Sequence, residues 1–329
     1  MMTWVFRQIG RVLVLLLIAV AAVYVLGPTE DVTLDPQFDA AAIGADPAAY
    51  LAGQEAQVSD IIPGTQKRII WAAEPGAATP ISLLYVHGFS ATSEEIRPVP
   101  DRLAADLGAN LVYTRLQGHG RSAPDAMAEG TVAGWMRDLA EGLAVARATG
   151  ERVIVIATST GGTLVAGAQV VPGLMDDVAG VILVSPNFGL NTGVEPMLTL
   201  PAARYWVPLI AGQRRSFEPR NDGQAEFWTT DYPSTAVFPM AALVKAVREI
   251  NYEQTSVPAL FAFSAADQVV RPDITTQIMA DWGGPTARFD PGEMTAADDP
   301  LAHVIAGDIM SPSKTEATVT AMRAWIEGL

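Results

Sequence analysis

The stretch IATSTGGT, residues 156–163, has the residue types of a turn that presents a nucleophilic serine. It ends an apolar run, and Ser159 is followed by Gly161 and Gly162. A serine at a sharp turn between a strand and a helix lies near the first amides of that helix, which stabilise a developing oxyanion. Ala157, however, replaces the first glycine of the Gly-x-Ser-x-Gly pattern. By itself the stretch leaves two interpretations open: a catalytic serine or a polar residue in an ordinary turn.

Two further residues with the right chemistry also follow strand-like runs. Asp267 comes after PALFAFSA, and His303 lies in the loop after TARFD. In an open α/β sheet, reactive groups gather beyond the carboxyl ends of the strands. Ser159, Asp267 and His303 are in the chain order of a nucleophile, an orienting acid and a general base. Asp298 and Asp299 are alternatives to Asp267, or else solvated loop residues.

The sequence contains only three histidines, which narrows the choice of a base. His87 lies in the tripeptide HGF, and His119 lies in the loop GHGRS. Only His303 comes after both the serine and the candidate acid. We therefore expect His303 to be the base.

From about Trp71 to the C-terminus the chain resembles α/β-hydrolases of the carboxylesterase and monoacylglycerol-lipase-like type. The HGF tripeptide, the GHGRS loop, the S-x-G-G turn, the D-x-V-V segment and the late histidine occur in that family's order. The resemblance implies that Ser159 attacks an acyl carbon, that His303 transfers the proton, and that Asp267 orients the imidazole. It implies no metal and no organic cofactor.

The resemblance also implies supporting roles around the serine. The backbone amides of Phe89 and Thr160 would form an oxyanion hole. The residues expected to support the turn and the neighbouring loops are Gly88, Gly161, Gly162, His87 and His119. Since alanine is the smallest side chain, we expect Ala157 to be tolerated in place of glycine.

Apolar runs rich in Val, Ile and Leu alternate with helical patterns over most of the chain. The sequence predicts strands at 67–72, 81–86, 109–116, 152–158, 178–186, 258–265 and 286–290. It predicts helices at 46–56, 96–108, 135–150, 163–171 and 315–329. Near-continuous apolar strands separated by helices indicate a mostly parallel central sheet with helices on both faces. This is the α/β class, and with the motifs above it predicts an α/β-hydrolase fold.

The alternation lapses in residues 187–255, a stretch rich in aromatic residues and proline that we interpret as a helical cap. Candidate substrate-binding residues there are Trp206, Trp228, Arg214 and Arg215. With Arg220 the two arginines form a small cationic cluster, which is either a solvated face or a site for an anionic substrate. Further side chains with the size to line an acyl pocket are Leu198, Tyr205, Phe217, Phe227, Phe238 and Met240. Most of these apolar residues are expected to belong to the core of the cap.

The first 27 residues form a separate unit, with Arg7 and Arg11 before an uncharged run from Val12 to Leu26. This pattern predicts a signal-anchor, with a cleaved signal peptide and a buried helix as alternatives. The first two alternatives place the body of the protein outside the cytoplasm, in the periplasm or the extracellular space. The expected division is 1–27 for this segment, 28–57 for a linker and short helix, 58–186 and 256–329 for the hydrolase core, and 187–255 for the cap.

Composition excludes other classes of function. The 329-residue chain carries a formal charge of −15 at pH 7, which disfavours binding to nucleic acid. It has no cysteine, so disulfides, thiolate catalysis and cysteine-based metal sites are excluded. The resulting prediction is a serine hydrolase for small or medium carboxylic esters. A proline iminopeptidase-like, other amide or thioester hydrolase and an inactive membrane-tethered binding module are the alternatives, and the oligomeric state is left open.

Overall fold

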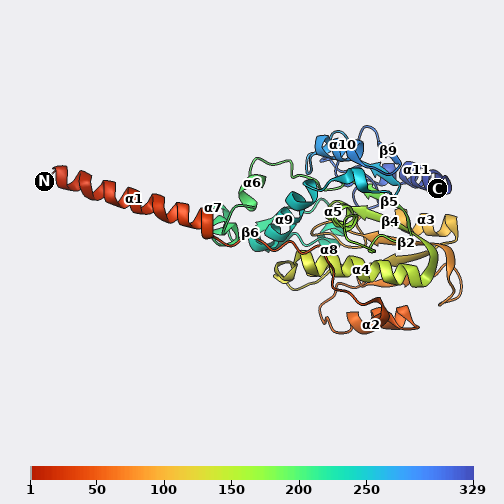
Figure 1. The fold of residues 1–329 in the computed structure, drawn as a ribbon. Helices are drawn as coiled ribbons and strands as arrows, with labels where there is room; N and C mark the ends of the chain where they lie inside the picture. The colour runs from red at the N-terminus through yellow and green to blue at the C-terminus, as the bar shows by residue number, and fades with distance from the viewer. Residues whose placement is uncertain (1) are drawn as a thin grey trace.

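The computed structural model describes residues 2–329, with side chains described from Trp4 onward. Its centre is a seven-stranded sheet in the order β1-β3-β2-β4-β5-β8-β9 (Figure 1). Only β1 is antiparallel to its neighbour, and the other strands run parallel. The strands are β1 (Arg68–Ile70), β2 (Thr79–Val86), β3 (Asn110–Tyr113), β4 (Gly150–Thr158), β5 (Val178–Val184), β8 (Ala259–Ala262) and β9 (Thr286–Phe289).

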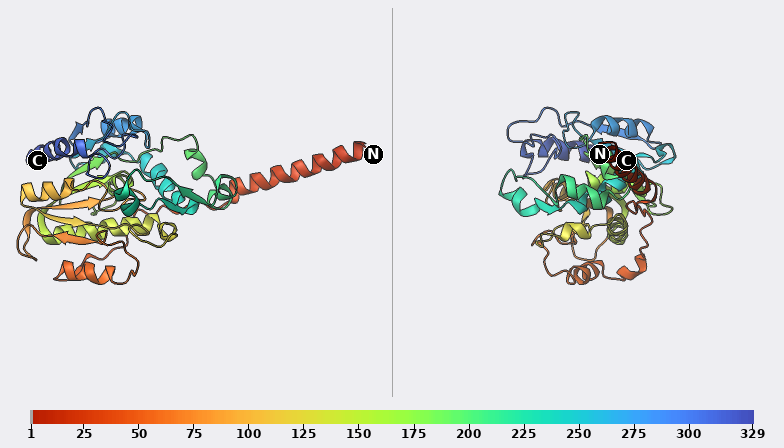
Figure 2. Two further views of the ribbon diagram at one scale, coloured as in Figure 1. Left: turned by 180° about the vertical axis from the view of Figure 1, so that it is seen from behind. Right: turned by 90° about the vertical axis from the view of Figure 1, so that its left-hand side faces the viewer.

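Helices cover both faces of this sheet (Figure 2). They are α2 (Pro47–Glu55), α3 (Val99–Leu107), α4 (Val132–Thr149), α5 (Thr160–Ala168), α10 (Pro272–Asp281) and α11 (Thr315–Glu327). Short 3-10 turns occur at Ala40–Ile43, Ala126–Glu129, Ser234–Ala236, Tyr252–Gln254 and Pro312–Lys314. The predicted α/β-hydrolase fold with a mostly parallel sheet is confirmed. The sequence patterns did not predict helix α10.

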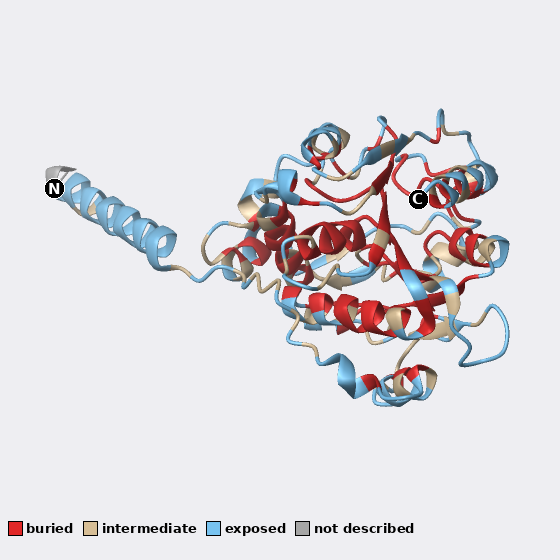
Figure 3. Ribbon diagram, turned by 45° about the vertical axis from the view of Figure 1, so that its right-hand side comes forward, coloured by how far each residue is buried: buried red, intermediate tan, exposed pale blue. Residues whose placement is uncertain are grey.

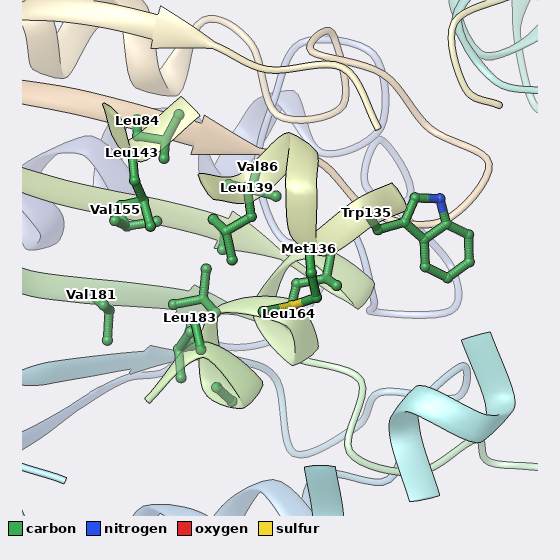
Figure 4. Packing of buried hydrophobic residues seen from close by; sticks show 14 of the residues in the cluster. Leu84, Val86, Trp135, Met136, Leu139, Leu143, Val155, Leu164, Val181 and Leu183 are labelled. Carbon is green, nitrogen blue, oxygen red and sulfur yellow. The ribbon is translucent and has the colours of Figure 1, made fainter. Parts of the chain in front are cut away.

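Burial on both faces explains why the central strands are apolar without alternation. In β2, Leu84 and Val86 pack against α4 and α5, whereas Leu83 and Tyr85 pack on the opposite side with α3 and α11. Successive side chains of a strand point to opposite faces, so a strand covered on both sides must be apolar at every position. Figure 4 shows the first of these clusters, in which the side chains of β2, β4 and β5 meet those of α4 and α5.

Residues 187–255 lie beyond the carboxyl end of β5 and contain a second set of elements. These are α6 (Glu195–Leu198), α7 (Ala203–Ala211), α8 (Asp222–Phe227), α9 (Val237–Arg248) and the two-stranded antiparallel pair β6 (Arg214–Ser216) and β7 (Asp231–Pro233). The sequence patterns did not predict the strand pair. Helix α9 is mostly buried and packs against α5, so it joins this segment to the core.

Helix α1 (Met2–Leu26) extends away from the body of the molecule (Figure 1). None of its apolar window from Trp4 to Leu26 is buried, and it is long and apolar enough to cross a membrane. Its surface is exposed along almost its whole length, in contrast to the buried core of the body (Figure 3). A buried core helix, one of the alternatives from the sequence, is therefore excluded.

The residues that follow α1 lie against the body. Val32, Leu34 and Phe38 pack against the main apolar cluster, and Ile43 is buried within it. Glu55, at the end of α2, forms a buried ion pair with Arg115 at 2.8 Å. This stretch is therefore part of the packed domain and not a free linker.

Candidate active site

Ser159 occupies the tight turn between β4 and α5, with φ of 50° and ψ of −116°. A positive φ is unusual for a residue other than glycine, and the surrounding packing must hold it in place. A Cβ atom at Gly161 would lie 2.4 Å from the carbonyl oxygen of Val86, and one at Gly162 would lie 2.9 Å from Cβ of Pro186. Because the first contact is with backbone, position 161 has no space for a side chain.

Ala157, which replaces the first glycine of the pattern, is fully buried in β4. Its side chain belongs to the apolar cluster between the sheet and helices α4 and α5. The methyl group is accommodated there, and the turn at Ser159 keeps its sharp geometry.

The structure brings Ser159, His303 and Asp267 together in a hydrogen-bonded chain. Nδ1 of His303 lies 2.8 Å from Oδ2 of Asp267. Nε2 of His303 lies 3.1 Å from Oγ of Ser159. Since an ionised carboxylate only accepts, Nδ1 carries the proton and Nε2 is the free acceptor that faces the serine hydroxyl. This is the arrangement in which an imidazole removes a proton from a serine.

Electrostatics favour proton uptake by His303. Burial by itself lowers the pKa of this imidazole, while the charge of Asp267 and the hydrogen bond to it raise that pKa. The carboxylates of Glu95 and Asp299 act in the same direction. The net effect raises the pKa of His303 above its ordinary value, so the protonated form of this imidazole is stabilised.

Backbone amides fix the carboxylate that faces the histidine. Oδ1 of Asp267 accepts hydrogen bonds from the amides of Val269 at 2.8 Å and Val270 at 3.0 Å. These bonds leave Oδ2 directed at His303. The carboxylate is therefore held by the loop that follows β8.

Asp298 and Asp299 are neither solvated nor in the place of Asp267. Both are buried. Oδ2 of Asp299 accepts the backbone amide of His303 at 3.0 Å and that of Val304 at 2.9 Å, which positions the loop that carries the histidine. Asp298 instead accepts hydrogen bonds from Thr295 and Ser313. Sequence proximity to His303 is the signal that points to Asp299, although its bonds are to backbone atoms.

Two unoccupied amides adjoin the serine. Within residues 2–329, neither the Phe89 amide nor the Thr160 amide donates a hydrogen bond to a protein acceptor. Thr160 is the first residue of α5 and lines the same cavity as Ser159 and Phe89. Gly88, which precedes Phe89, is close to the serine, since a Cβ at Gly88 would lie 3.1 Å from Cβ of Ser159. The pair is therefore available for an oxygen atom of a ligand.

A buried carboxyl group holds the loop that carries Phe89. Oε2 of Glu95 accepts the Gly88 amide at 2.7 Å and the Tyr85 hydroxyl at 3.1 Å. That hydroxyl also lies 3.1 Å from Oγ1 of Thr158, the residue before Ser159. Burial raises the pKa of Glu95 to about 7. The sequence gives no sign of this role for Glu95, because one of two adjacent glutamates is ordinarily a solvated residue.

His87 and His119 do not contact Ser159 through hydrogen bonds. Nδ1 of His87 lies 2.8 Å from the carbonyl oxygen of Gly88, and its Nε2 accepts the amide of Leu116 at 3.1 Å. His119 lies 3.1 Å from the carbonyl oxygen of Gln117, and the two imidazole rings are 5.1 Å apart. Burial lowers the pKa of both histidines, so both are neutral at pH 7. Their positions link the HGF loop to the loop after β3.

A cavity of about 610 Å³ opens onto Ser159 and His303. Apolar side chains that line it from the cap and neighbouring loops are Leu190, Val194, Leu198, Phe217, Trp228 and Met240. Besides His303, the cavity is lined by five side chains of ionisable type: Glu95, Arg215, Glu218, Arg220 and Asp299. Within residues 2–329, no three histidine or carboxylate side chains form a group that would hold a metal ion.

The other cap residues named from the sequence lie away from this cavity. Arg214 is on the surface and pairs with Asp125 and Asp231. Trp206 donates its indole N–H to the carbonyl oxygen of Pro201 at 3.1 Å and packs against the apolar cluster of the cap. The cationic cluster is therefore divided, because Arg215 lines the cavity and Arg214 does not. Tyr205, Phe227 and Phe238 are also outside the lining.

A known protein family matches most of the body of this chain. The sequence profile of the family described as "Serine aminopeptidase, S33" matches residues 80–289. This range is more than half of the chain, and it contains Ser159 and Asp267 but ends before His303.

Individual relatives extend the comparison. The thermostable monoacylglycerol lipase of Bacillus sp. (strain H-257) is 33% identical over 101 residues, which are 30% of this chain and 40% of that protein. The alignment therefore spans less than half of the relative's length.

Similar solved structures share the fold. The structure of one of two metagenome-derived lipolytic enzymes has a TM-score of 0.65 at 19% identity and covers 82% of this chain and 100% of its own. A soluble variant of monoglyceride lipase from Saccharomyces cerevisiae has a TM-score of 0.62 at 11% identity, over 80% of this chain and 91% of its own. The monoacylglycerol lipase of Paleococcus ferrophilus has a TM-score of 0.52 at 16% identity, over 79% and 96%.

Proposed function

Since the chain belongs to the serine aminopeptidase S33 family of α/β-hydrolases, we propose that it is a serine ester hydrolase that acts through an acyl-enzyme. One observation carries this proposal: Ser159, His303 and Asp267 form a hydrogen-bonded chain beside two unoccupied amides at the mouth of an apolar cavity. The substrates we propose are carboxylic esters with an apolar acyl or alcohol group, such as monoacylglycerols.

In the first half of the reaction, Nε2 of His303 removes the proton of Ser159 as Oγ attacks the carbonyl carbon of the ester. The carbonyl oxygen becomes an oxyanion and accepts hydrogen bonds from the amides of Phe89 and Thr160. The imidazolium, stabilised by Asp267, then protonates the leaving alcohol as the carbon–oxygen bond breaks. The products of this half are the free alcohol and an acyl group on Ser159.

In the second half, a water molecule takes the place of the alcohol. His303 removes a proton from the water as its oxygen attacks the acyl carbon, and the same two amides stabilise the second oxyanion. Return of the proton to Oγ of Ser159 releases the carboxylic acid. Both halves need His303 in its neutral form at the start, so acidification below its pKa stops the reaction.

The lining of the cavity supports an ester over a peptide. Apolar side chains such as Val194, Leu198 and Phe217 suit an acyl chain, whose burial supplies binding free energy of about 0.8 kcal/mol per methylene. The monoacylglycerol lipase of Bacillus sp. supports the same class of substrate.

An aminopeptidase is the second candidate, and the description of the family favours it. Such an enzyme must recognise the free amine of its substrate with a carboxylate. Glu218 and Glu95 line the cavity and could serve that purpose. A panel of p-nitrophenyl esters assayed beside an aminoacyl p-nitroanilide distinguishes the two, because an aminopeptidase prefers the anilide with a free amine.

We further propose that α1 is a signal-anchor and that the body lies outside the cytoplasm. The segment Trp4–Leu26 is apolar on average and none of it is buried, and Arg7 and Arg11 lie near its start. Positive residues before a membrane span favour a cytoplasmic N-terminus. In this arrangement Pro28 and the residues after it are on the far side of the membrane.

The test of the proposed reaction is covalent labelling followed by turnover. A fluorophosphonate probe should label the full-length protein at Ser159, and Ser159→Ala should lower kcat on p-nitrophenyl esters by about 10⁴-fold or more. Peptide mass spectrometry of the adduct identifies the labelled residue. An unlabelled, folded protein would contradict the proposal.

The matched control is Ser185→Ala. Ser185 is also a buried serine with a positive φ at the end of a strand, β5, but it has no hydrogen bond to a histidine. This variant should retain labelling and turnover. Loss of both activities in Ser185→Ala would show that the assay reports folding and not the chemistry of Ser159.

A further inference from the structure

We propose that the outer face of helix α7 docks into the surface of the lipid bilayer that α1 crosses, so that the cap rests on the membrane. The face consists of Tyr205, Leu209 and Ile210, together with Leu200 in the preceding loop. This inference rests on the proposed membrane anchorage and, for its consequence, on the proposed ester hydrolysis.

The exposure of these side chains is the first observation. Leu209 is 76% exposed, Ile210 is 70% exposed and Tyr205 is 65% exposed. The buried residues of α7 are Ala203, Val207 and Pro208, and the first two belong to the apolar cluster of the cap. Single exposed apolar side chains are common, but several that lie close together on one helix mark a surface that meets an apolar partner.

The sequence around this surface also has few charged residues compared with the rest of the protein. Between Glu195 and Arg214 the only charged residue is Arg204, although the whole chain carries a charge of −15. Arg204 is itself neutralised by a bidentate contact with Glu30 at 2.6 and 2.8 Å. A segment without net charge avoids the cost of bringing ions to the edge of a hydrocarbon layer.

The connection between α1 and the body is the second observation, because it leaves no flexible spacer. The carbonyl oxygen of Pro28, two residues after the end of α1, accepts the amide of Ala202 at 2.6 Å. Ala202 immediately precedes α7, and the Glu30–Arg204 contact ties the same two segments again. The end of α1 therefore adjoins the start of α7, as the views in Figures 1 and 2 also show.

The length of the uncharged part of α1 is the third observation. Val12–Leu26 contains 15 residues, which span about 22 Å as a helix. The hydrocarbon core of a bilayer is about 30 Å thick. Arg11 can reach outward along its aliphatic stem, but the span still ends at or inside the far interface. Leu26, which is 81% exposed, is thus at the membrane surface, and α7 beside it must be there too.

Docking has a consequence for the proposed substrate. Helix α6 adjoins α7, and Leu198 of α6 lines the catalytic cavity. A lipid ester leaving the bilayer at α7 would pass from one apolar surface to the next before it reaches Ser159. The cap therefore joins the membrane surface to the catalytic cavity.

The test measures the depth of α7 in a bilayer and uses the absence of cysteine in the chain. Full-length Leu209→Cys, carrying one nitroxide label, is placed in nanodiscs of phosphatidylcholine. The control is Leu329→Cys, because Leu329 is also exposed, at 41%, and lies at the opposite end of the molecule from α1 (Figure 1). Collisions with oxygen report an apolar environment, and collisions with a soluble nickel chelate report water.

We expect the label at position 209 to be several-fold less accessible to the nickel chelate than the label at position 329, and more accessible to oxygen. Equal accessibility of the two positions to nickel would overturn the proposal. Dipolar broadening between labels at 209 would also overturn it, because this result would identify a second copy of the chain as the occupant. Neither the accessibility measurement nor the dipolar broadening depends on catalysis, so this test is independent of the proposed reaction.

A second variant pair measures the consequence. Leu209→Glu with Ile210→Glu should lower hydrolysis of a long-chain monoacylglycerol in the nanodisc by about tenfold or more, and leave hydrolysis of soluble p-nitrophenyl acetate unchanged. Leu329→Glu should change neither rate. An unchanged rate on the membrane substrate would overturn the role in delivery, whereas absence of any hydrolysis by the unaltered protein would overturn the proposed reaction alone.

Discussion

The edge of the sheet that carries Ser159 and the cap that faces it are built on different principles. At the sheet edge, hydrogen bonds hold the candidate acid and the loop before Phe89: two backbone amides bind Asp267, and Glu95 accepts the Gly88 amide. The cap contributes mainly apolar side chains to the cavity, and its outer helix α7 is exposed. The sheet edge therefore holds individual polar atoms at fixed distances from one another, whereas the cap supplies apolar surface.

The two regions also differ in the space around their glycines. Gly161 at the sheet edge has backbone atoms within 2.4 Å of where a Cβ would be, while Gly193 in the cap has nothing within 4 Å. Chemistry that depends on distances near 3 Å needs the first kind of environment, because small displacements weaken proton transfer. Binding of apolar groups is not directional, so the second kind suffices for it.

The largest difference between the two regions is expected for a substitution of the candidate acid, Asp267, compared with one in the cap. Asp267→Asn should lower kcat on p-nitrophenyl esters by roughly 10⁴-fold, because the neutral amide neither selects the productive tautomer of His303 nor stabilises its charged form. Steady-state kinetics at several pH values measure the loss. Asp222→Asn, an exposed residue of α8 in the cap, should be without effect. Retention of more than about a tenth of the activity in Asp267→Asn would place the acid elsewhere.

A smaller effect, on stability, is expected from the two glycines. Gly161→Ala should lower the Tm by roughly 3–10 °C, because the added methyl group meets backbone that has no room to move. Gly193→Ala should change the Tm by less than about 2 °C. Thermal unfolding followed by circular dichroism measures both. Equal Tm values for the two variants would mean that the turn at Ser159 is not held as tightly as its contacts indicate.

The smallest effect is a displaced pH profile. The carboxylate of Glu95 raises the pKa of His303, so Glu95→Gln should lower that pKa while keeping an oxygen that accepts the Gly88 amide. Because the reaction needs neutral His303, the rising limb of kcat/KM should move to lower pH. Arg215→Gln, which removes a charge from the cap side of the cavity, should leave the limb in place. A limb that does not move in Glu95→Gln would contradict the electrostatic contact with His303.

Much of the fold follows from short-range patterns. The strands and most helices of the body are encoded in runs of Val, Ile and Leu and in helical periodicity, which reflect burial on two faces or on one. The site follows from order along the chain: Ser159, Asp267 and His303 come after strands of a parallel sheet, and the carboxyl ends of such strands meet at one edge. The apolar helix α1 is likewise evident from composition alone.

What the sequence did not reveal depends on contacts between distant segments. Glu95 looks like a surface residue until Tyr85 and Gly88 are seen to enclose it. Which cap residues face Ser159 also could not be predicted, since apolar side chains pack either inward or toward a cavity with the same local pattern. The segment that follows α1 meets α7 through residues 174 positions apart, Glu30 and Arg204.

By itself, then, the sequence determined the fold class, the chain order of the three candidate catalytic side chains and the presence of an apolar N-terminal helix, because each follows from local composition or spacing. Only the tertiary structure decided which groups support those three, which side of the cap lines the cavity, and which side faces outward beside α1. The physical reason is that burial, pKa and docking surfaces depend on the neighbours that packing brings together, and those neighbours are remote in the chain.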